Sequence, residues 1–243
     1  MQLRQVLFSQ GFGSRRECDA LILGGLVRIG DRVVDDPGAE VAATGLVFQV
    51  RDEAWAFHDK ALLMLHKPAG YECSTKPRHH PSVLGLLPLP LRQRGVQPIG
   101  RLDQDTTGLL LFTDDGTLLH RLTSPKWHVP KRYVADCAEP VTPEQVQRLL
   151  DGVVLRDDPQ PVRAAACQAV GERRLEITLT EGKYHQVKRM VAAAGNAVQA
   201  LQRLRFGALE LPADLQPGQW RWVERGSIDA KLAMPGREPA HGR

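Results

Sequence analysis

Long apolar runs are missing from this sequence, and cysteine is scarce. No uninterrupted apolar stretch approaches the roughly 18 residues of a membrane-spanning helix, so we expect no membrane partner. The first residues lack the apolar core of a secretion signal, which favours a cytoplasmic protein. The cysteines form no Cys-x-x-Cys pair, so free thiols are expected rather than a disulfide framework or a zinc site. They are Cys18, Cys73, Cys137 and Cys167.

The excess of positive over negative charge is also small, but it is unevenly distributed along the chain. The 243 residues carry a net charge of +4. Residues 1–50 hold five Lys/Arg against six Asp/Glu, whereas residues 60–243 hold 26 against 19. The larger part of the chain is therefore the basic part, which favours a polyanionic partner, although proteins that bind no nucleic acid also carry surpluses of this size.

The first 50 residues have the pattern of a compact unit with two helices and short strands. Helical spacing of apolar residues from Leu3 ends near Gly11, and SRRE over residues 14–17 is a capping box that opens a second helix. That helix stops at Gly24, and short strand-like runs follow to Val50.

The capping box, the following hairpin and the Pro-Gly turn at residues 37–38 together resemble the S4 RNA-binding domain. The resemblance implies that Arg15 and Arg16, at the start of the second helix, face RNA phosphates. The alternative is an ordinary solvated helix start. Because the local net charge is −1, we expect this unit to bind RNA weakly by itself.

From residue 61 onward, strands and helices are mixed without regular β-α-β alternation, which indicates an α+β fold. Within this part, GRLDQDTTG over residues 100–108 is a polar loop with two carboxylates, followed by an apolar strand. A loop fastened to a buried strand can hold a reactive group rigidly while leaving it open to substrate. The alternative is that these Asp and Thr side chains bond their own backbone.

The GRLDQDTTGLL segment resembles the active-site motif of the bacterial pseudouridine synthases that modify ribosomal RNA. HKPAG over residues 66–70, KRY over 131–133 and EGKYHQVKRM over 181–190 occur in the family's order, with His66 where Asn is usual. The resemblance covers about residues 1–230. It implies a bent, mainly antiparallel mixed sheet with flanking helices. We predict an S4-like domain over 1–50, a polar linker over 51–60, a catalytic domain over 61–233 and a disordered tail over 234–243.

The resemblance also implies roles for individual residues. Asp103 is the nucleophile or base near C1′ of the target nucleotide, Lys188 is its cationic partner, and Tyr133 stacks on the flipped base. Without the resemblance, Lys188 would belong to a solvated basic helix face, and Tyr133 would pack half-buried. The further candidates for RNA contacts are Arg101, Lys67, His185, Gln186, Arg203 and Arg205.

The reaction breaks the N1–C1′ bond, turns the uracil and rejoins it through C5, so no cofactor or metal is required. Paired aspartates in turns are usually caps, and no nearby His completes a metal-ligand set. A glycosidase uses two carboxylates at a defined distance from each other, and the sequence alone does not give that distance.

The residues of the YHQVK and CST…HP segments resemble the branch of the family that acts on small-subunit rRNA. The resemblance implies a monomer that isomerises uridine 516 of 16S rRNA, in a partly assembled small subunit. Two alternatives stay open: a sister enzyme acting on 23S rRNA, and a non-catalytic S4-type RNA-binding or ribosome-assembly factor.

Overall fold

The N-terminal unit consists of two helices packed on a small sheet. The computed structural model describes residues 1–156 and 158–229; the predicted tail and residues 230–233 lie outside this range. Helix α1 (Leu3–Gln10) ends at Gly11 in a left-handed conformation, and α2 (Arg15–Leu23) begins at the predicted capping box. The sheet has the order β2-β1-β3-β4, all antiparallel. Its strands are β1 (Val27–Ile29), β2 (Arg32–Val33), β3 (Val47–Val50) and β4 (Glu53–Ala56).

The polar linker predicted over residues 51–60 contains a strand at its centre, so these central residues belong to the N-terminal sheet and not to a linker. Residues 53–56 form β4, which pairs with β3 along its whole length. Trp55 is only 7% exposed, because it packs into the same core as Phe12 and Phe48. The four residues Glu-Ala-Trp-Ala lack clear polar–apolar alternation, so their sequence does not indicate a strand.

A nine-stranded, mainly antiparallel sheet makes up most of the remaining chain, which confirms the α+β prediction. Its main path is β11-β12-β8-β13-β7-β5-β15, with β14 added to β13 and β6 added to β7. Strands β7 and β13 are parallel and join the two halves of the sheet. The strands are β5 (Leu62–Lys67), β6 (Gln97–Ile99), β7 (Thr107–Thr113), β8 (Lys131–Cys137), β11 (Ala166–Gly171), β12 (Arg174–Leu179), β13 (Val198–Phe206), β14 (Leu209–Glu210) and β15 (Trp220–Trp222); β9 (Val153–Leu155) and β10 (Asp158–Val162) form a separate pair.

Successive side chains along β5 and β7 point to opposite faces of the sheet, so the first half of the sheet contributes to two hydrophobic cores. Leu63 and Leu110 join the core that continues into the N-terminal unit, whereas Met64 and Leu109 join a core beneath α4 and α7. A third core lies between the second half of the sheet and helices α5 and α6. The helices are α3 (Leu89–Gln93), α4 (Gly116–Thr123), α5 (Pro143–Asp151), α6 (Gln186–Ala193) and α7 (Arg225–Asp229), with 3-10 turns η1 (Val83–Leu86) and η2 (Pro125–Trp127).

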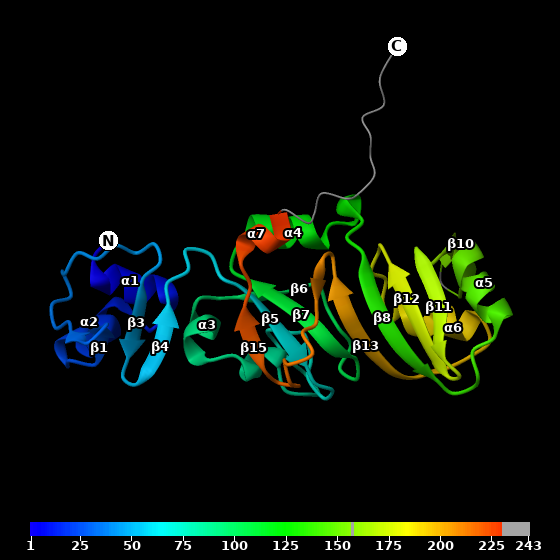
Figure 1. Cartoon of the computed structure of the whole chain (residues 1–243), viewed down its shortest axis with the longest axis horizontal. Coiled ribbons are helices and arrows are strands. Elements are labelled where there is room, and N and C mark those ends of the chain that lie inside the picture. Colours follow the sequence, from blue (N-terminus) through cyan, green and yellow to red (C-terminus); the bar gives the residue numbers. More distant parts are fainter. Residues whose placement is uncertain (157, 230–243) are drawn as a thin grey trace, which may run out of the picture.

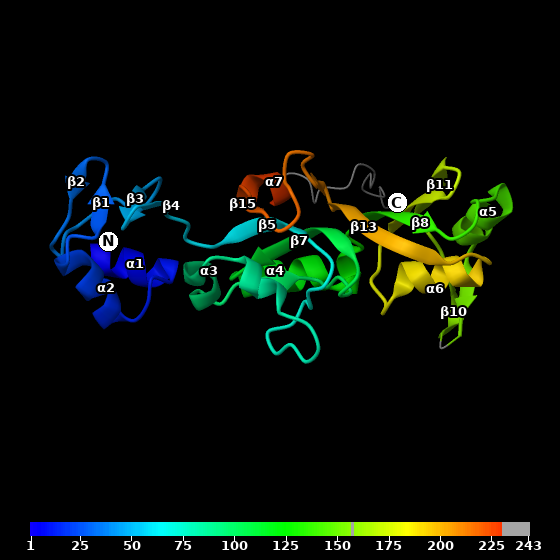
Figure 2. The same ribbon diagram turned by 90° about the horizontal axis from the view of Figure 1, so that it is seen from below.

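Figures 1 and 2 show an elongated molecule, with α2 at one end and α5 and α6 at the other. No helix in the part of the chain that the structure describes is long and apolar enough to cross a membrane.

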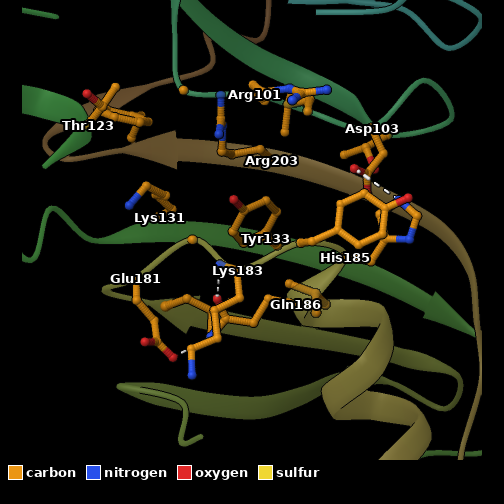
Figure 3. A pocket seen from close by; sticks show the side chains of 18 of the residues that line it. Arg101, Asp103, Thr123, Lys131, Tyr133, Glu181, Lys183, His185, Gln186 and Arg203 are labelled. Atoms are coloured by element: carbon orange, nitrogen blue, oxygen red, sulfur yellow. Dashed lines mark hydrogen bonds and ion pairs between the residues drawn. The ribbon is translucent and has the colours of Figure 1, made fainter. Parts of the chain in front are cut away.

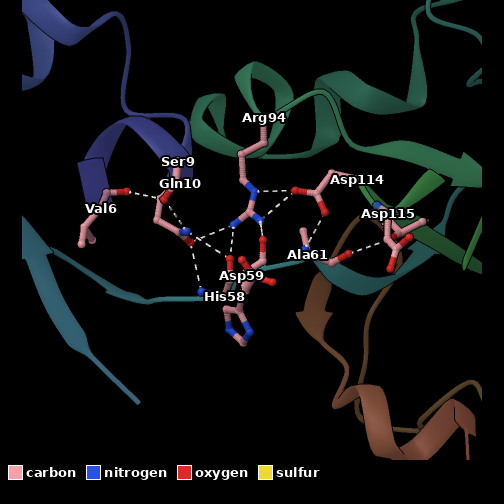
Figure 4. Close-up of polar contacts among 10 residues, drawn as sticks. Val6, Ser9, Gln10, His58, Asp59, Ala61, Arg94, Asp114 and Asp115 are labelled. Carbon is pink, nitrogen blue, oxygen red and sulfur yellow. Dashed lines mark hydrogen bonds and ion pairs between the residues drawn. The ribbon is translucent and has the colours of Figure 1, made fainter. Parts of the chain in front are cut away.

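Arg94 connects the N-terminal unit to the large sheet at what we call the sheet junction, formed by Gln10, His58, Asp59, Arg94 and Asp114 (Figure 4). Its side chain is 2% exposed, and it donates from Nε and Nη2 to the Asp114 carboxylate. The other donors reach the Gln10 side chain and the His58 and Asp59 carbonyls. All five guanidinium N–H donors therefore have an acceptor.

Candidate active site

Residues 100–106 of the GRLDQDTTG segment form a loop between β6 and β7, and Thr107 and Gly108 already belong to β7. Gly108, at φ +104°, pairs with Arg203 across the parallel β7–β13 contact. A Cβ at Gly108 would lie 2.2 Å from the Arg203 carbonyl oxygen, so only glycine allows these two strands to meet here. This contact fixes the loop against the centre of the sheet.

Lys67 holds the loop from below. It is fully buried, and its ammonium group donates to the carbonyls of Pro68, Asp103, Gln104 and Thr106 over 2.8–3.2 Å. Burial lowers the pKa of Lys67. The expected RNA contact of Lys67 is therefore wrong, because its ammonium group is buried and donates its hydrogen bonds to backbone carbonyls of the Asp103 loop.

Asp103 faces two groups from the start of α6. Its Oδ1 lies 3.3 Å from His185 Nε2, and its Oδ2 lies 3.8 Å from Lys188 Nζ. The side chain of Asp103 is 27% exposed, so it remains open to a ligand.

The main partner of Lys188 is Asp105 rather than Asp103. Lys188 Nζ lies 2.7 Å from both Asp105 oxygens, and this hydrogen-bonded pair lowers the pKa of Asp105. Lys188 therefore lies at ion-pair distance from Asp103, but it bridges two carboxylates of one loop and is nearer to Asp105.

Helix α6 presents the faces that its sequence predicts. Val187 and Met190 are buried in the third core, while His185 and Lys188 point toward the Asp103 loop. His185 has a left-handed backbone (φ +48°) directly before the helix, and its ring stacks on Tyr184 at 3.7 Å between centroids.

Gln186 is 4% exposed, and both ends of its amide are occupied. Its oxygen accepts from the Lys183 backbone N–H, and its nitrogen donates to the Glu181 carboxylate. Gln186 thus shapes the turn before α6 and also lines the pocket, so its substrate contact stays a prediction.

A pocket of about 430 Å³ opens beside Asp103, a volume typical of small-molecule sites. In the view of Figure 3, Tyr133 lies between Lys131 on one side and Asp103 with His185 on the other. Arg101 also lines the pocket; it is exposed, and the described residues offer its side chain no hydrogen bond or ion pair.

Arg203 lines the same pocket but is only 1% exposed. Its Nε donates to the Leu109 carbonyl at 2.8 Å. Because Arg203 is buried, only a group that enters the pocket can reach it, so an RNA contact by Arg203 is restricted to the base that occupies the pocket. Arg205 is half-buried and donates to the Gly207 carbonyl.

Two pocket residues, Lys131 and Glu181, were not singled out from the sequence as site residues. Lys131 precedes Tyr133 by two positions on β8, so both side chains lie on one face of the strand. That spacing was the available signal. Burial, followed by the nearby Arg203, lowers the pKa of Lys131 to about 8, while Glu181 acts in the opposite direction.

The structure does not bring every predicted residue together. Arg15 and Arg16 are exposed on α2, at the opposite end of the molecule from α6 (Figures 1 and 2). Arg15 lies over the Phe8 ring at 5.5 Å. Within residues 1–156 and 158–229, no group of three or more His, Cys, Asp or Glu side chains is arranged to hold a metal ion.

Comparisons with known proteins show the family of the chain. The family model described as RNA pseudouridylate synthase matches residues 61–193, and the S4 domain model matches residues 1–46. The chain is 43% identical over 164 residues to ribosomal small subunit pseudouridine synthase A of Escherichia coli (strain K12), covering 68% of this chain and 71% of that protein. The protein of the same name from Vibrio vulnificus (strain CMCP6) is 36% identical over 232 residues, covering 95% of this chain and 99% of that protein.

A solved structure described as a pseudouridylate synthase is also similar, with a TM-score of 0.68 and 32% identity over 96% of this chain and 99% of that one. The family's members are isomerases that act on RNA. This chain belongs to the RNA pseudouridylate synthase family.

Proposed function

We propose that this enzyme converts one uridine of small-subunit ribosomal RNA to pseudouridine, with Asp103 as the reacting carboxylate. The observation that carries the proposal is the placement of Asp103. It lies on a loop tied down by the buried Lys67, faces His185 and Lys188, and opens onto a pocket that contains Tyr133.

The geometry supports a division of labour among these residues. The target base must leave its stack to enter a pocket of this kind. Tyr133 offers its ring to the base, and Asp103 approaches C1′ as nucleophile or base. His185 Nε2 and Lys188 Nζ lie 3.3 Å and 3.8 Å from the Asp103 carboxylate and hold it at the edge of the pocket.

The reaction is an isomerisation that balances within the substrate. The N1–C1′ bond breaks, the uracil turns, and a C5–C1′ bond forms. The proton on C5 leaves and N1 gains one, so nothing is consumed and no redox step occurs.

The choice of RNA follows from the relatives. Proteins 43% and 36% identical to this chain are named for the ribosomal small subunit. We therefore propose 16S rRNA as the substrate. Uridine 516 in a partly assembled subunit is the target that the family resemblance implies, and it belongs to the proposal. Arg15 and Arg16 of the S4 unit, together with Arg205, are candidates for RNA contacts outside the pocket, and Arg101 is a candidate for a contact at its wall.

Tritium release from C5-labelled uridine tests this proposal. Wild-type enzyme is incubated with 16S rRNA, naked or bound to ribosomal proteins, and with 23S rRNA, and the modified position is mapped. We expect release of one equivalent from 16S rRNA at a single position. Release only from 23S rRNA would identify the sister activity. RNA binding without release from either would make the chain an RNA-binding factor and contradict the proposal.

A further inference from the structure

The pocket wall contains a buried arginine with an unused donor. Arg203 is 1% exposed, yet its Nη2 has no hydrogen-bond partner in the structure. Leaving a buried charged donor unpaired costs free energy, so native proteins rarely do so without a functional reason.

Lys131 is a second under-used cation in the same wall. Its Nζ donates to one acceptor, the Val129 carbonyl at 3.0 Å, whereas an ammonium group has three donors. Within the described residues, no carboxylate lies at ion-pair distance from Lys131 or Arg203.

Strand register brings the two cations to the same place. Lys131 lies opposite Phe206, and Tyr133 lies opposite Arg203, across the antiparallel β8–β13 pair. A bulge between Arg203 and Arg205 changes the alternation of β13, so that Arg203 and Phe206 both line the pocket. The Phe206 ring then lies 5.5 Å from Lys131 Nζ and 5.3 Å from the Arg203 guanidinium carbon.

We infer that Lys131 and Arg203 bind the carbonyl oxygens of the target uracil, chiefly O4, and stabilise the negative charge that the base acquires when its glycosidic bond breaks. This inference rests on the proposed function. The electron pair of the N1–C1′ bond moves to N1 and is shared with O2 and O4. Fixed cations at those oxygens would stabilise the charge as it develops.

The orientation of the base follows from the two ends of the pocket. C1′ and N1 must lie at the Asp103 end. O4 is across the ring from N1 and therefore points past Tyr133 toward Lys131 (Figure 3). The phosphates are attached to the sugar and stay at the Asp103 end. Cytosine carries an amino group in place of O4, and this hydrogen-bond donor would face two cationic donors, so the same pair would also reject cytidine.

Lys131→Met removes the charge while keeping most of the side-chain volume, and Lys131→Arg keeps the charge. The matched control is Lys60→Met at an exposed position outside the site. Single-turnover tritium release and the Kd for 16S rRNA are measured for each protein, with urea unfolding to confirm that the variants fold. We expect Lys131→Met to slow release about 100-fold, the loss typical of one missing oxyanion donor, with a Kd within about threefold of wild type. Lys131→Arg should retain most of the rate.

The pH profile gives a second readout. Arg203 on β13 and Glu181 in the turn after β12 are the charged groups that act on Lys131, and its pKa is lowered to about 8. Its protonated fraction therefore falls as pH rises through about 8, and the wild-type rate should fall with it. In Lys131→Arg this alkaline decline should disappear, because arginine stays charged.

A Lys131→Met rate close to that of wild type would overturn the inference. A loss of RNA affinity parallel to the loss of rate would also overturn it, because it would indicate a phosphate contact. These outcomes are distinct from failure of the proposed function, in which wild-type enzyme itself releases no tritium.

Discussion

Two buried arginines show how the sheet junction differs from the pocket. Arg94 and Arg203 are both almost fully removed from solvent. Every N–H donor of Arg94 has a protein acceptor, including the Asp114 carboxylate. Arg203 has a carbonyl for Nε and nothing for Nη2. The first arrangement is complete without a ligand, whereas the second becomes complete only when a ligand supplies an acceptor.

The largest expected change in stability comes from the sheet junction. Arg94→Met leaves Asp114 and the Gln10 amide oxygen without their cationic partner, so we expect the free energy of unfolding to fall by about 3–5 kcal/mol in urea titrations. The control is Arg225→Met, which breaks the ion pair with Asp115 at a side chain that is 53% exposed, and should cost less than about 1 kcal/mol. Equal losses in the two variants would show that burial of the Arg94 pair contributes nothing.

Gly108→Ala is expected to rank next, at about 3 kcal/mol. The added Cβ would overlap the Arg203 backbone, and the alanine would also have to adopt a backbone φ of +104°, which is strained for any residue except glycine. Gly116→Ala is the control, because it lies at the start of α4 with nothing within 4 Å of the new Cβ, and it should be close to neutral. A Gly108→Ala protein as stable as wild type would refute the close approach of β7 and β13.

Arg203→Met sharpens the comparison most directly. It removes one hydrogen bond but also removes an unpaired buried charge, so it should cost about 1 kcal/mol or less in urea unfolding, well below Arg94→Met. Tritium release should nevertheless fall. A stability loss as large as that of Arg94→Met would show that Arg203 is a structural residue like Arg94.

How far sequence predicts these features depends on where each partner lies along the chain. The capping box at Ser14 was predictable, because Ser14 pairs with Glu17, three positions later. The burial of Lys67 and Arg203 was not, because their carbonyl partners at Asp103 and Leu109 lie 36 and 94 positions away. A cation whose partners are distant looks in sequence like a surface residue.

The site shows the same limit. The motifs bring Asp103, Tyr133 and the start of α6 together, as the resemblance implies. The preference of Lys188 for Asp105 depends on how the loop is folded, and the β13 bulge that turns Phe206 into the pocket has no local sequence signal. These details are set by packing and had to come from the structure.

The smallest expected effect concerns the Asp105–Lys188 pair, which is partly exposed. Asp105→Asn should lower the free energy of unfolding by less than about 1 kcal/mol at neutral pH. Because the pKa of Asp105 is lowered in the folded protein, its contribution is present above the unfolded-state pKa and is lost as pH falls through the folded-state pKa. The difference between wild type and Asp105→Asn should therefore vanish in acid. A difference that grows in acid would contradict the assigned pKa direction.

The most direct test of the account compares the two carboxylates of one loop. Asp103→Asn and Asp105→Asn are assayed for single-turnover tritium release from 16S rRNA, with RNA binding measured in parallel. The account predicts that Asp103→Asn loses at least about 10³-fold in rate while still binding RNA, as expected when a reacting group is removed, and that Asp105→Asn stays within about tenfold of wild type. An active Asp103→Asn enzyme beside an inactive Asp105→Asn enzyme would contradict it and move the chemistry to the carboxylate that Lys188 holds.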